Sequence, residues 1–353
     1  MRIKTNKRLM PMLAVCLLFM AIIASACSNK TETNTENSAA PNTPAATAVV
    51  TDNAASPSPE ASALVGGSFP RTVDSANGPL TIEKKPQKVA LVHWGLMDDL
   101  LTFDLPSIGL ALPFTAKQSS LDTEQYKPYA DKFSEVVFVG ENTEVNLEAL
   151  LAYEPDLILA GTVTNEKILK ELSQIAPTLL IDEEKTNVWG DWQAVVTKFG
   201  EALGQEENAQ KFIDEYAAKV VAAKLQLSGI EGTVAFVQVR EKNMYLQGTN
   251  YADQFYEALG LTPPEAAKGE GAELTLEGLS VINPDHLVLG YFNYTDTTLP
   301  ALSDEWGKSE VWKKLKAVEQ GHVYGINGAL AFGFGPIGRA YGMEIIAKEL
   351  KSK

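Results

Sequence analysis

The chain has 353 residues, a formal net charge of −15 at pH 7 and two cysteines, Cys16 and Cys27. Such an acidic protein repels the phosphates of nucleic acid, so we expect no nucleic-acid partner. Because both cysteines precede the folded body, thiol catalysis, cysteine–zinc sites and iron–sulfur clusters are excluded there, and a body of this size can bury a large core without a disulfide.

The N-terminal segment has the pattern of a secretory signal. It begins with the basic residues Arg2, Lys4, Lys7 and Arg8 and continues with an apolar run, Leu9–Ile23. Small residues then lead to Cys27. The run is too short to span a bilayer comfortably. The block resembles the signal and lipobox of bacterial lipoproteins, with Ala24 where leucine is usual. We therefore expect residues 1–26 to be a signal peptide and Cys27 to carry lipid. A plain signal peptide or an uncleaved anchor is the alternative.

The segment after the signal reads as a tether. Two or three acyl chains on Cys27 would hold the protein stably at a membrane. Residues 27–68 continue with serine, threonine, asparagine, alanine and proline and have almost no large apolar side chains. Such a composition buries too little surface to offset the entropy of ordering, so we predict a disordered tether. It would let the folded body move above the membrane.

The first half of the folded body, residues 69–205, alternates strands with helices. It opens with a predicted hairpin in which Asn77-Gly78 joins Arg71–Asp74 to Leu80–Glu83. Five apolar runs typical of buried strands follow, at Val89–Val92, Ile108–Leu112, Val136–Val139, Leu157–Ala160 and Thr178–Ile181. Helical patterns lie between them, one of them capped by Asn146. This alternation predicts βαβ units and a largely parallel sheet.

A long helix is predicted over Glu206–Leu227, because its apolar residues share one face and glycines follow it. The alternation then resumes, with apolar segments at Val234–Val239, Met244–Leu246, Phe255–Leu259, Leu287–Leu289 and Val323–Ile326 and a last helix from Pro336. The predicted fold class is α/β, with two α/β lobes of mainly parallel sheets. One long helix, residues 206–228, would join them, and residues 229–353 would form the C-terminal lobe. A single α/β domain is the alternative.

Several short phrases occur in an order and spacing typical of one family. They are Pro86–Leu91, Val145–Leu150, Glu154–Ile158, Ala176-Pro177-Thr178, Phe255–Gly260, Asn283-Pro284-Asp285, Val311–Val318 and His322-Val323-Tyr324. With these phrases, residues 69–352 resemble the substrate-binding lipoproteins of ABC importers for ferric siderophores, haem and cobalamin. The resemblance implies two lobes on a rigid helix, with a ligand cleft between them.

The resemblance also implies a function and partners. Such proteins capture a ferric siderophore on the extracytoplasmic face of the cell membrane and deliver it to an ABC permease. One glutamate on each lobe docks onto arginines of the permease, and Glu148 and Glu257 match those positions. The alternative for both is an ordinary solvated helix residue. We expect a lipid-anchored monomer from a bacterium, of Gram-positive type, whose ligand is an iron(III)–siderophore complex and which needs no cofactor.

Candidate ligand-binding residues follow the predicted strands, because clefts in open α/β folds form at the carboxyl ends of strands. They are His93, Trp94, Lys117, Thr162, Arg240, Tyr291, Asn327, Phe332, Phe334 and Arg339. Arginine would supply bidentate bonds to an anionic chelate, and the aromatic residues would supply contact area. For the aromatic residues, a place in a lobe core is the alternative. His93 could be a haem ligand, but an ordinary polar cleft lining fits it better.

Two further motifs are better explained structurally. Gly333–Gly338 fits Gly-x-Gly-x-x-Gly, but it lacks the following βαβ unit and acidic residue, so we expect Pro336 to open the final helix. Asp98-Asp99 is an acidic pair whose members point to different faces of a helix. Three histidines without converging ligands argue against a bare metal site.

A binding protein is therefore favoured over an enzyme, since the sequence has no nucleophile–base arrangement and no phosphate loop. A haem- or cobalamin-binding lipoprotein of the same fold is the nearer alternative. An exported surface hydrolase or an adhesin is the alternative from a different class.

Overall fold

The computed structural model describes residues 67–292 and 301–351, which belong to one compact unit, Ser62–Lys353. The predicted signal peptide, Cys27 and nearly all of the tether lie outside the described residues. A small hairpin opens the unit: β1 (Arg71–Val73) pairs antiparallel with β2 (Leu80–Ile82), and Gly78 in the turn has a φ of 110°. The predicted hairpin is thus confirmed.

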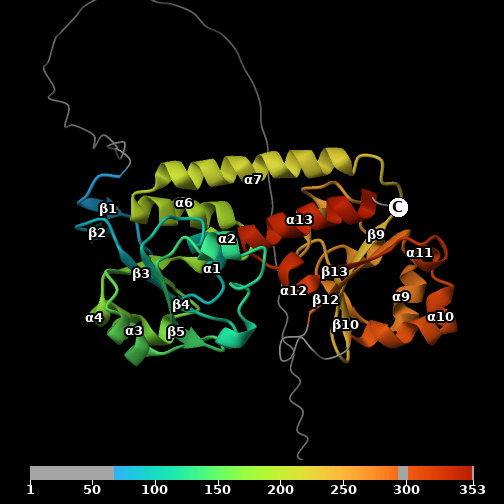
Figure 1. Cartoon of the computed structure of the whole chain (residues 1–353), viewed down its shortest axis with the longest axis horizontal. Coiled ribbons are helices and arrows are strands. Elements are labelled where there is room, and N and C mark those ends of the chain that lie inside the picture. Colours follow the sequence, from blue (N-terminus) through green and yellow to red (C-terminus); the bar gives the residue numbers. More distant parts are fainter. Residues whose placement is uncertain (1–66, 293–300, 352–353) are drawn as a thin grey trace, which may run out of the picture. The chain divides into compact units, whose positions relative to one another are not determined.

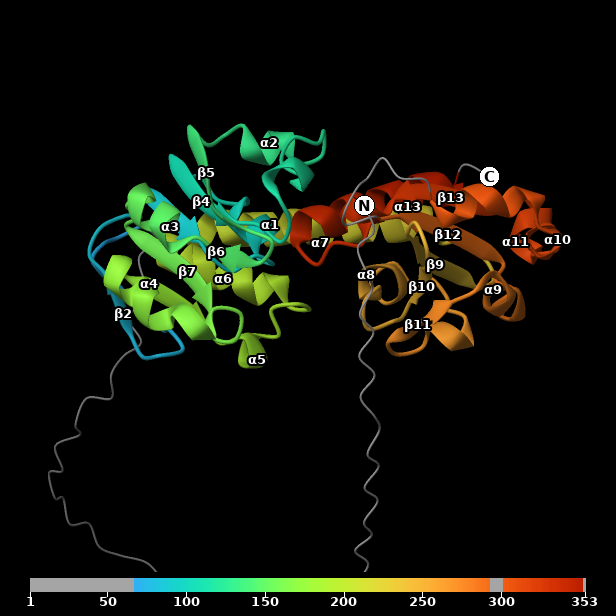
Figure 2. The same cartoon turned by 90° about the horizontal axis from the view of Figure 1, so that it is seen from below.

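The N-terminal lobe is built on a six-stranded sheet of order β6-β5-β4-β3-β7-β8, in which only the edge strand β6 is antiparallel (Figures 1 and 2). Its strands are β3 (Lys88–Leu91), β4 (Ser107–Ala111), β5 (Glu135–Glu141), β6 (Glu144–Val145), β7 (Leu157–Gly161) and β8 (Thr178–Ile181). Its helices are α1 (Met97–Leu100), α2 (Lys127–Ala130), α3 (Leu147–Tyr153), α4 (Leu169–Ile175), α5 (Glu183–Thr186) and α6 (Trp192–Leu203), with short 3-10 helices at Ala116–Gln118 and Glu166–Ile168. The five predicted runs are the five parallel strands, with helices packed on both faces.

The C-terminal lobe has a five-stranded mixed sheet of order β11-β10-β9-β12-β13. Strands β9, β12 and β13 pair in parallel, and β10 pairs antiparallel with both β9 and β11. Its strands are β9 (Val234–Val239), β10 (Met244–Gln247), β11 (Gly271–Leu274), β12 (His286–Tyr291) and β13 (Val323–Asn327). Its helices are α8 (Asp253–Tyr256), α9 (Leu276–Ile282), α10 (Glu310–Lys313), α11 (Lys316–Glu319), α12 (Gly328–Ala331) and α13 (Pro336–Lys351), with 3-10 helices at Glu265–Ala267 and Leu302–Lys308. The apolar segment Phe255–Leu259 begins in α8 and continues past its end.

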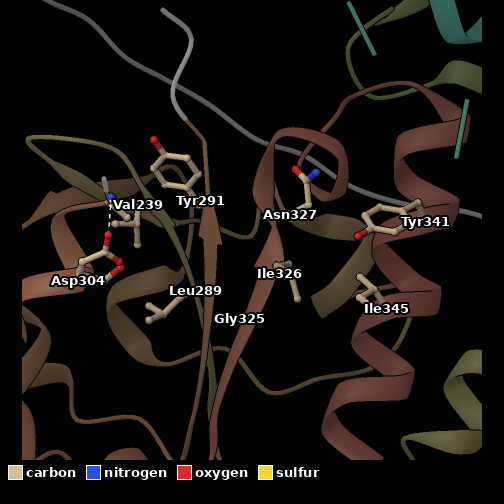
Figure 3. A pocket seen from close by; sticks show the side chains of 11 residues that line it. Val239, Leu289, Tyr291, Asp304, Gly325, Ile326, Asn327, Tyr341 and Ile345 are labelled. Carbon is tan, nitrogen blue, oxygen red and sulfur yellow. Dashed lines mark hydrogen bonds between the residues drawn. The ribbon is translucent and has the colours of Figure 1, made fainter. Parts of the chain in front are cut away.

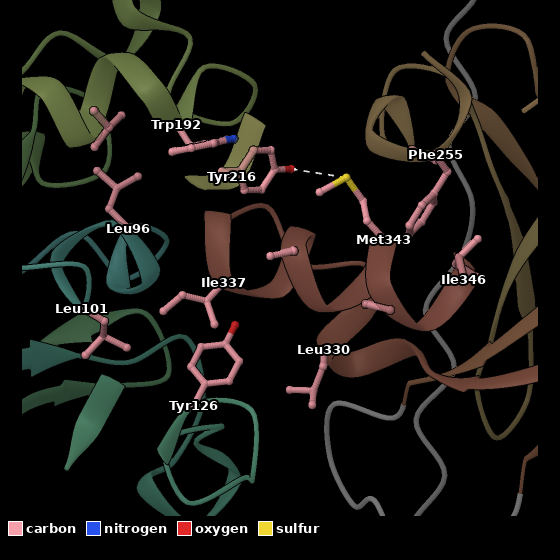
Figure 4. Close-up of a cluster of buried hydrophobic side chains, with 14 of the residues drawn as sticks. Leu96, Leu101, Tyr126, Trp192, Tyr216, Phe255, Leu330, Ile337, Met343 and Ile346 are labelled. Atoms are coloured by element: carbon pink, nitrogen blue, oxygen red, sulfur yellow. Dashed lines mark hydrogen bonds between the residues drawn. The ribbon is translucent and has the colours of Figure 1, made fainter. Parts of the chain in front are cut away.

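The long connecting helix is present as α7 (Glu206–Gln226), 21 residues long, and it runs along both lobes in Figure 1. It packs against α6 on one side and α13 on the other. The first turns of α13 also reach α1 of the N-terminal lobe, where Ile337 lies among Leu96, Leu101 and Tyr126 (Figure 4). The two lobes therefore share one continuous hydrophobic core, which restrains their relative movement.

A buried carboxylate ties the lobes together at this junction. Asp98 of α1 accepts hydrogen bonds from the backbone N–H groups of Ile337 at 3.1 Å and Gly338 at 2.9 Å, and from the Tyr126 hydroxyl at 3.0 Å. It thus caps the first turn of α13 from the other lobe, where the N–H groups have no partner within the helix. The approach is so close that a Cβ at Gly335 would lie 2.3 Å from the Asp98 side chain.

The two lobes also repeat one stretch of sequence and structure at a constant offset. Glu144–Leu159 matches the stretch that begins at Glu273, including two leucines in the helix, a glutamate at its second position and Pro-Asp after it. The repeat covers α3 and α9, which are both seven residues long. Each helix starts at a side-chain cap, Asn146 or Thr275, and ends at a left-handed residue. The lobes are therefore built on the same helix–strand unit.

The Pro-Asp pair has the same structural role in both lobes. The Asp156 carboxylate accepts from the backbone N–H groups of Gln87 at 3.0 Å and Lys88 at 2.7 Å, at the start of β3. The Asp285 carboxylate accepts from Thr233 N–H at 2.7 Å, next to the start of β9. Each aspartate joins the beginnings of two parallel strands, so these sequence phrases maintain strand register.

A histidine pair lies at the start of β12 and β13, at the end of the sheet opposite the cleft. The rings of His286 and His322 stack with centroids 4.5 Å apart. Nε2 of His286 is 3.1 Å from the Glu231 carbonyl and Nδ1 is 3.2 Å from the Tyr324 hydroxyl. Because a carbonyl only accepts, Nε2 carries a proton and donates to it. Burial, then His322 and Lys316, lowers the pKa of His286, although the Glu231 carbonyl and Asp285 act in the opposite direction.

We expect the protein to lose stability on mild acidification through His286. Its pKa in the folded state lies below the ordinary value of 6.5, so the unfolded chain binds a proton first as the pH falls through that value. The free energy of unfolding should then fall, by at most about 1.4 kcal/mol per pH unit for one proton. Urea denaturation at pH 7.5 and 5.5 measures this change. His286→Gln should reduce it, and an unchanged slope would contradict the assignment to His286.

Candidate functional site

A pocket of about 620 Å³ lies between the lobes at the carboxyl ends of their strands. From the N-terminal lobe it is lined by Met97 and by the loop after β4, with Leu112, Pro113, Phe114, Thr115, Lys117, Gln118, Ser119, Ser120 and Thr123. From the C-terminal lobe it is lined by Tyr291 and Phe292 after β12 and by Asn327, Ala329 and Leu330 after β13. This is where an open α/β fold holds its ligand.

Two further hollows of the C-terminal lobe adjoin this cleft. One, of about 690 Å³, shares Tyr291 and Asn327 with it and extends between them and Tyr341 of α13 (Figure 3). Its wall includes Asp304, whose carboxylate accepts from the backbone N–H of Ala301 at 3.1 Å. The other hollow, of about 440 Å³, shares Phe292 with the cleft and is lined by Arg240, Tyr245, Tyr251, Glu270, Glu273, Phe332 and Phe334 among others.

The structure brings six of the ten predicted ligand residues to these hollows. Lys117, Tyr291 and Asn327 line the cleft, and Arg240, Phe332 and Phe334 line the smaller hollow beside it. The Arg240 guanidinium lies 4.9 Å from the Tyr245 ring centroid and donates to the Gln238 side-chain carbonyl at 2.9 Å. The Asn327 side chain caps α12 by accepting from Leu330 N–H at 3.3 Å. The arginine is therefore oriented by its own strand neighbours.

Trp94 belongs to an aromatic group at the junction of the lobes. Its ring lies 5.0 Å from that of Trp189, and Trp189 meets Phe334 edge to face at 5.5 Å. Trp189 precedes α6 and Phe334 precedes α13, so the group joins the two halves of the chain. Sequence reasoning missed Trp189, because it follows a short helix and no strand end marks it.

His93 is fully buried beneath this aromatic group. Its Nδ1 accepts from Gly95 N–H at 3.1 Å, so Nε2 carries the proton and donates to the Glu183 carboxylate at 3.0 Å. Burial lowers the pKa of His93, and the hydrogen bond to Glu183 opposes this only in part. Burial would raise the pKa of Glu183, but hydrogen bonds from Thr164, Val163 and His93 outweigh it and lower that pKa. Glu183 follows β8 and also accepts from the backbone N–H groups of Val163 and Thr164 after β7, so this histidine–carboxylate pair joins the ends of β3, β7 and β8.

Thr162 and Arg339 also have partners within the protein. The Thr162 hydroxyl accepts from Glu183 N–H at 3.3 Å. Arg339 is 4% exposed, donates to the Phe334 carbonyl at 2.8 Å and forms an ion pair with Asp253 at 2.9 Å. Arg339 therefore holds the loop that carries Phe334. Its predicted contact with ligand stays a prediction, as do those of His93 and Thr162.

The main wall of the cleft is the part that sequence reasoning missed. Apart from Lys117, the loop Leu112–Thr123 was not singled out, although it supplies most of the residues of the N-terminal lobe that line the pocket. Hydroxyl and amide side chains dominate its polar surface. Some already bond within the loop: the Thr115 hydroxyl donates to Gln118 at 2.9 Å and the Thr123 hydroxyl to the Ser120 carbonyl at 2.6 Å. The loop is thus shaped before ligand arrives.

Within the described part of the chain, no group of three or more histidine, cysteine, aspartate or glutamate side chains converges as a metal site. The cleft has instead a mixture of apolar area and a few polar groups from both lobes. Such a pocket suits a small organic molecule or complex.

Comparison with known proteins supports this picture. Residues 90–330 match the sequence family described as periplasmic binding protein. The iron-uptake system-binding protein of Bacillus subtilis is 28% identical over 65% of this chain and 70% of its own length. The Fe(3+) dicitrate-binding periplasmic protein FecB of Escherichia coli is 26% identical over 75% of this chain and 84% of its own. The structure of Staphylococcus aureus SirA complexed with staphyloferrin B has the same fold, with a TM-score of 0.61 and 22% identity over 79% of this chain and 98% of that one.

Proposed function

Because the chain belongs to the periplasmic binding protein family, we propose that it is the extracytoplasmic substrate-binding protein of an ABC importer and that it captures a ferric siderophore. The observation that carries this proposal is the cleft between two α/β lobes on one long helix, lined from both sides. Relatives named for iron uptake and for ferric dicitrate support the choice of ligand. Members of such a family bind substrates and do not transform them.

The cleft residues have suitable roles for such a ligand. Lys117 and Arg240 would contact oxygen atoms around the iron, since charged donors form the stronger hydrogen bonds. Tyr291, Phe292 and Phe114 would cover the apolar parts of the chelator. The iron stays inside its chelator, so the protein needs no metal ligands of its own.

We expect the body of the protein to bind a ferric siderophore one-to-one and to report this by quenching of tryptophan fluorescence. Trp94 and Trp189 lie together beside Phe334, so an iron chelate or a lobe movement nearby would change their emission. Fluorescence titration, with isothermal calorimetry for the stoichiometry, measures the binding. Binding of haem or cobalamin with no binding of any iron chelate would contradict the proposal. Failure of all these ligands would favour an exported hydrolase or an adhesin.

Attachment to the membrane is a separate part of the proposal. Among residues 67–292 and 301–351, no helix is long and apolar enough to cross a bilayer. We propose that Cys27, after removal of residues 1–26, carries the lipid that holds the protein at the outer face of a bacterial membrane, of Gram-positive type. Residues 27–68 would be the tether and the body would act as a monomer.

The docking surface for the permease is proposed from the repeat between the lobes. Glu148 is the exposed second residue of α3, and the repeat places Glu277 at the same position of α9. Glu257, predicted from the sequence, is also exposed but lies at the C-terminal end of α8. Two helices of equal length and equal capping present Glu148 and Glu277 in the same way. We therefore propose Glu148 with Glu277 as the docking pair, and Glu257 stays a prediction to be tested beside them.

A further inference from the structure

We propose that the cleft selects ferric chelates of low net charge, of the tris-hydroxamate type, over tris-catecholate and citrate complexes. This inference rests on the proposed function and concerns the same cleft. A tris-hydroxamate complex of iron(III) is neutral at its centre, because three singly charged groups balance the ion. A tris-catecholate complex is a trianion, and ferric dicitrate is also strongly anionic.

The charges that line the cleft and its two adjoining hollows nearly cancel. Among the described residues of the three linings, the cations are Lys117 and Arg240, and the carboxylates are Glu270, Glu273 and Asp304. The second arginine predicted for the site, Arg339, is buried and paired with Asp253. The lining thus lacks the excess of positive charge that a trianion needs.

The cost of burying a trianion decides the comparison. An ion that leaves water loses several kcal/mol of solvation, and only well-placed opposite charges restore it. Arg240 already donates a hydrogen bond to Gln238 and lies over the Tyr245 ring. The whole chain carries a formal charge of −15, and the electrostatic field of this negative charge opposes the approach of an anion. A neutral complex avoids both the loss of ionic solvation and the repulsion by the negative charge of the protein.

The remaining lining suits a neutral complex. The polar groups of the loop after β4 are Thr115, Gln118, Ser119, Ser120 and Thr123, and Asn327 and Tyr291 face them from the other lobe. Hydroxyl and amide side chains can donate to the iron-bound hydroxamate oxygens, which only accept, and can either donate to or accept from the amide groups of such chelators. The apolar residues Met97, Leu112, Phe114, Phe292 and Leu330 complete the wall and suit aliphatic chelator arms.

A competition between three chelates tests the inference. Ferrichrome, ferric enterobactin and ferric dicitrate would be titrated into the full protein at fixed ionic strength. We expect ferrichrome to bind about 100-fold more tightly than either anionic complex. A difference of this size corresponds to the cost of leaving one or two charged groups of the ligand without partners. Tighter binding of an anionic complex would overturn the inference and leave the proposed function intact. Failure of all three would count against the proposed function itself.

A designed cation provides the second test. Ala329 of α12 lines the cleft and is half-buried. Ala329→Lys should strengthen binding of ferric enterobactin about tenfold relative to the matched variant Ala329→Gln, whose side chain has a similar length and no charge. A tenfold gain is the effect expected of one added charge-assisted contact. Ferrichrome should bind both variants equally. Melting curves show whether each variant folds. No gain for enterobactin in a folded Ala329→Lys protein would show that charge does not limit selection.

Discussion

Iron uptake should fall to background when Glu148→Ala and Glu277→Ala are combined, while ligand affinity stays unchanged. Both carboxylates are exposed, each at the second position of its repeated helix, and neither lines the described hollows. Each single change should reduce uptake less, because one lobe remains docked. Arginine at either position should be worse than alanine, since it would repel arginines of the permease. The measurement is radio-iron uptake in cells that lack the native gene and carry each variant.

The matched control is the pair Glu148→Ala with Glu257→Ala. Exposed single charges contribute little to folding, so all these proteins should be expressed and melt almost normally. If the pair with Glu257 abolishes uptake and the pair with Glu277 does not, the assignment from the repeat is wrong and the sequence-based one is right. Normal uptake by both pairs would return all three residues to ordinary solvated helix positions.

Much of the fold could be predicted because it is encoded locally. The helix expected over Glu206–Leu227 is α7, Glu206–Gln226, since one apolar face and the glycines after it define its length. Continuous apolar runs found the parallel strands, which are covered on both faces. Strand β11, Gly271–Leu274, was missed because it is an antiparallel edge strand of mixed exposure with glycine, alanine and glutamate. Such a strand forms by pairing with β10, and sequence patterns do not reveal that pairing.

The site was harder to predict because its residues come together only in three dimensions. The structure places Tyr291, Asn327 and Arg240, which were chosen because they follow strands, at the hollows, and their contact with ligand stays a prediction. The same rule also selected His93 and Thr162, whose side chains bond to Glu183, a residue far away in the sequence. The loop Leu112–Thr123 has no motif, only small polar residues. Whether a polar side chain faces ligand or a buried partner depends on long-range packing.

The acidic pair Asp98-Asp99 is another case in which the role of a side chain depends on long-range packing, and its two members can be compared by mutation. The sequence showed only that the two side chains point to different faces. In the structure both are buried, but Asp98 accepts three hydrogen bonds at the lobe junction, whereas Oδ1 of Asp99 has no hydrogen-bond partner among the described residues. Burial and the adjacent Asp98 charge raise the pKa of Asp99 well above its ordinary value. Burial also raises the pKa of Asp98, but the hydrogen bonds from Gly338, Tyr126 and Ile337 oppose this shift. We therefore expect the hydrogen-bonded carboxylate of Asp98 to contribute more to stability than that of Asp99.

Asp98→Ala should lower the free energy of unfolding by about 3–5 kcal/mol, because Tyr126, Ile337 and Gly338 would each keep a buried donor without its acceptor. Asp98→Asn should cost less, since its carbonyl can still accept. The matched control Asp99→Asn should be neutral or stabilising, because burial and the neighbouring Asp98 disfavour the charged form of Asp99, and its Oδ1 has no hydrogen-bond partner among the described residues. Urea denaturation measures the free energy of unfolding of all three variants, and hydrogen exchange at the amides of Ile337 and Gly338 shows where the structure loosens. Faster exchange at these amides in Asp98→Ala, before global unfolding, would identify the carboxylate as the tie between the lobes. Equal stability of Asp98→Ala and Asp99→Asn would show that the cap contributes little and that the shared core alone fixes the lobes.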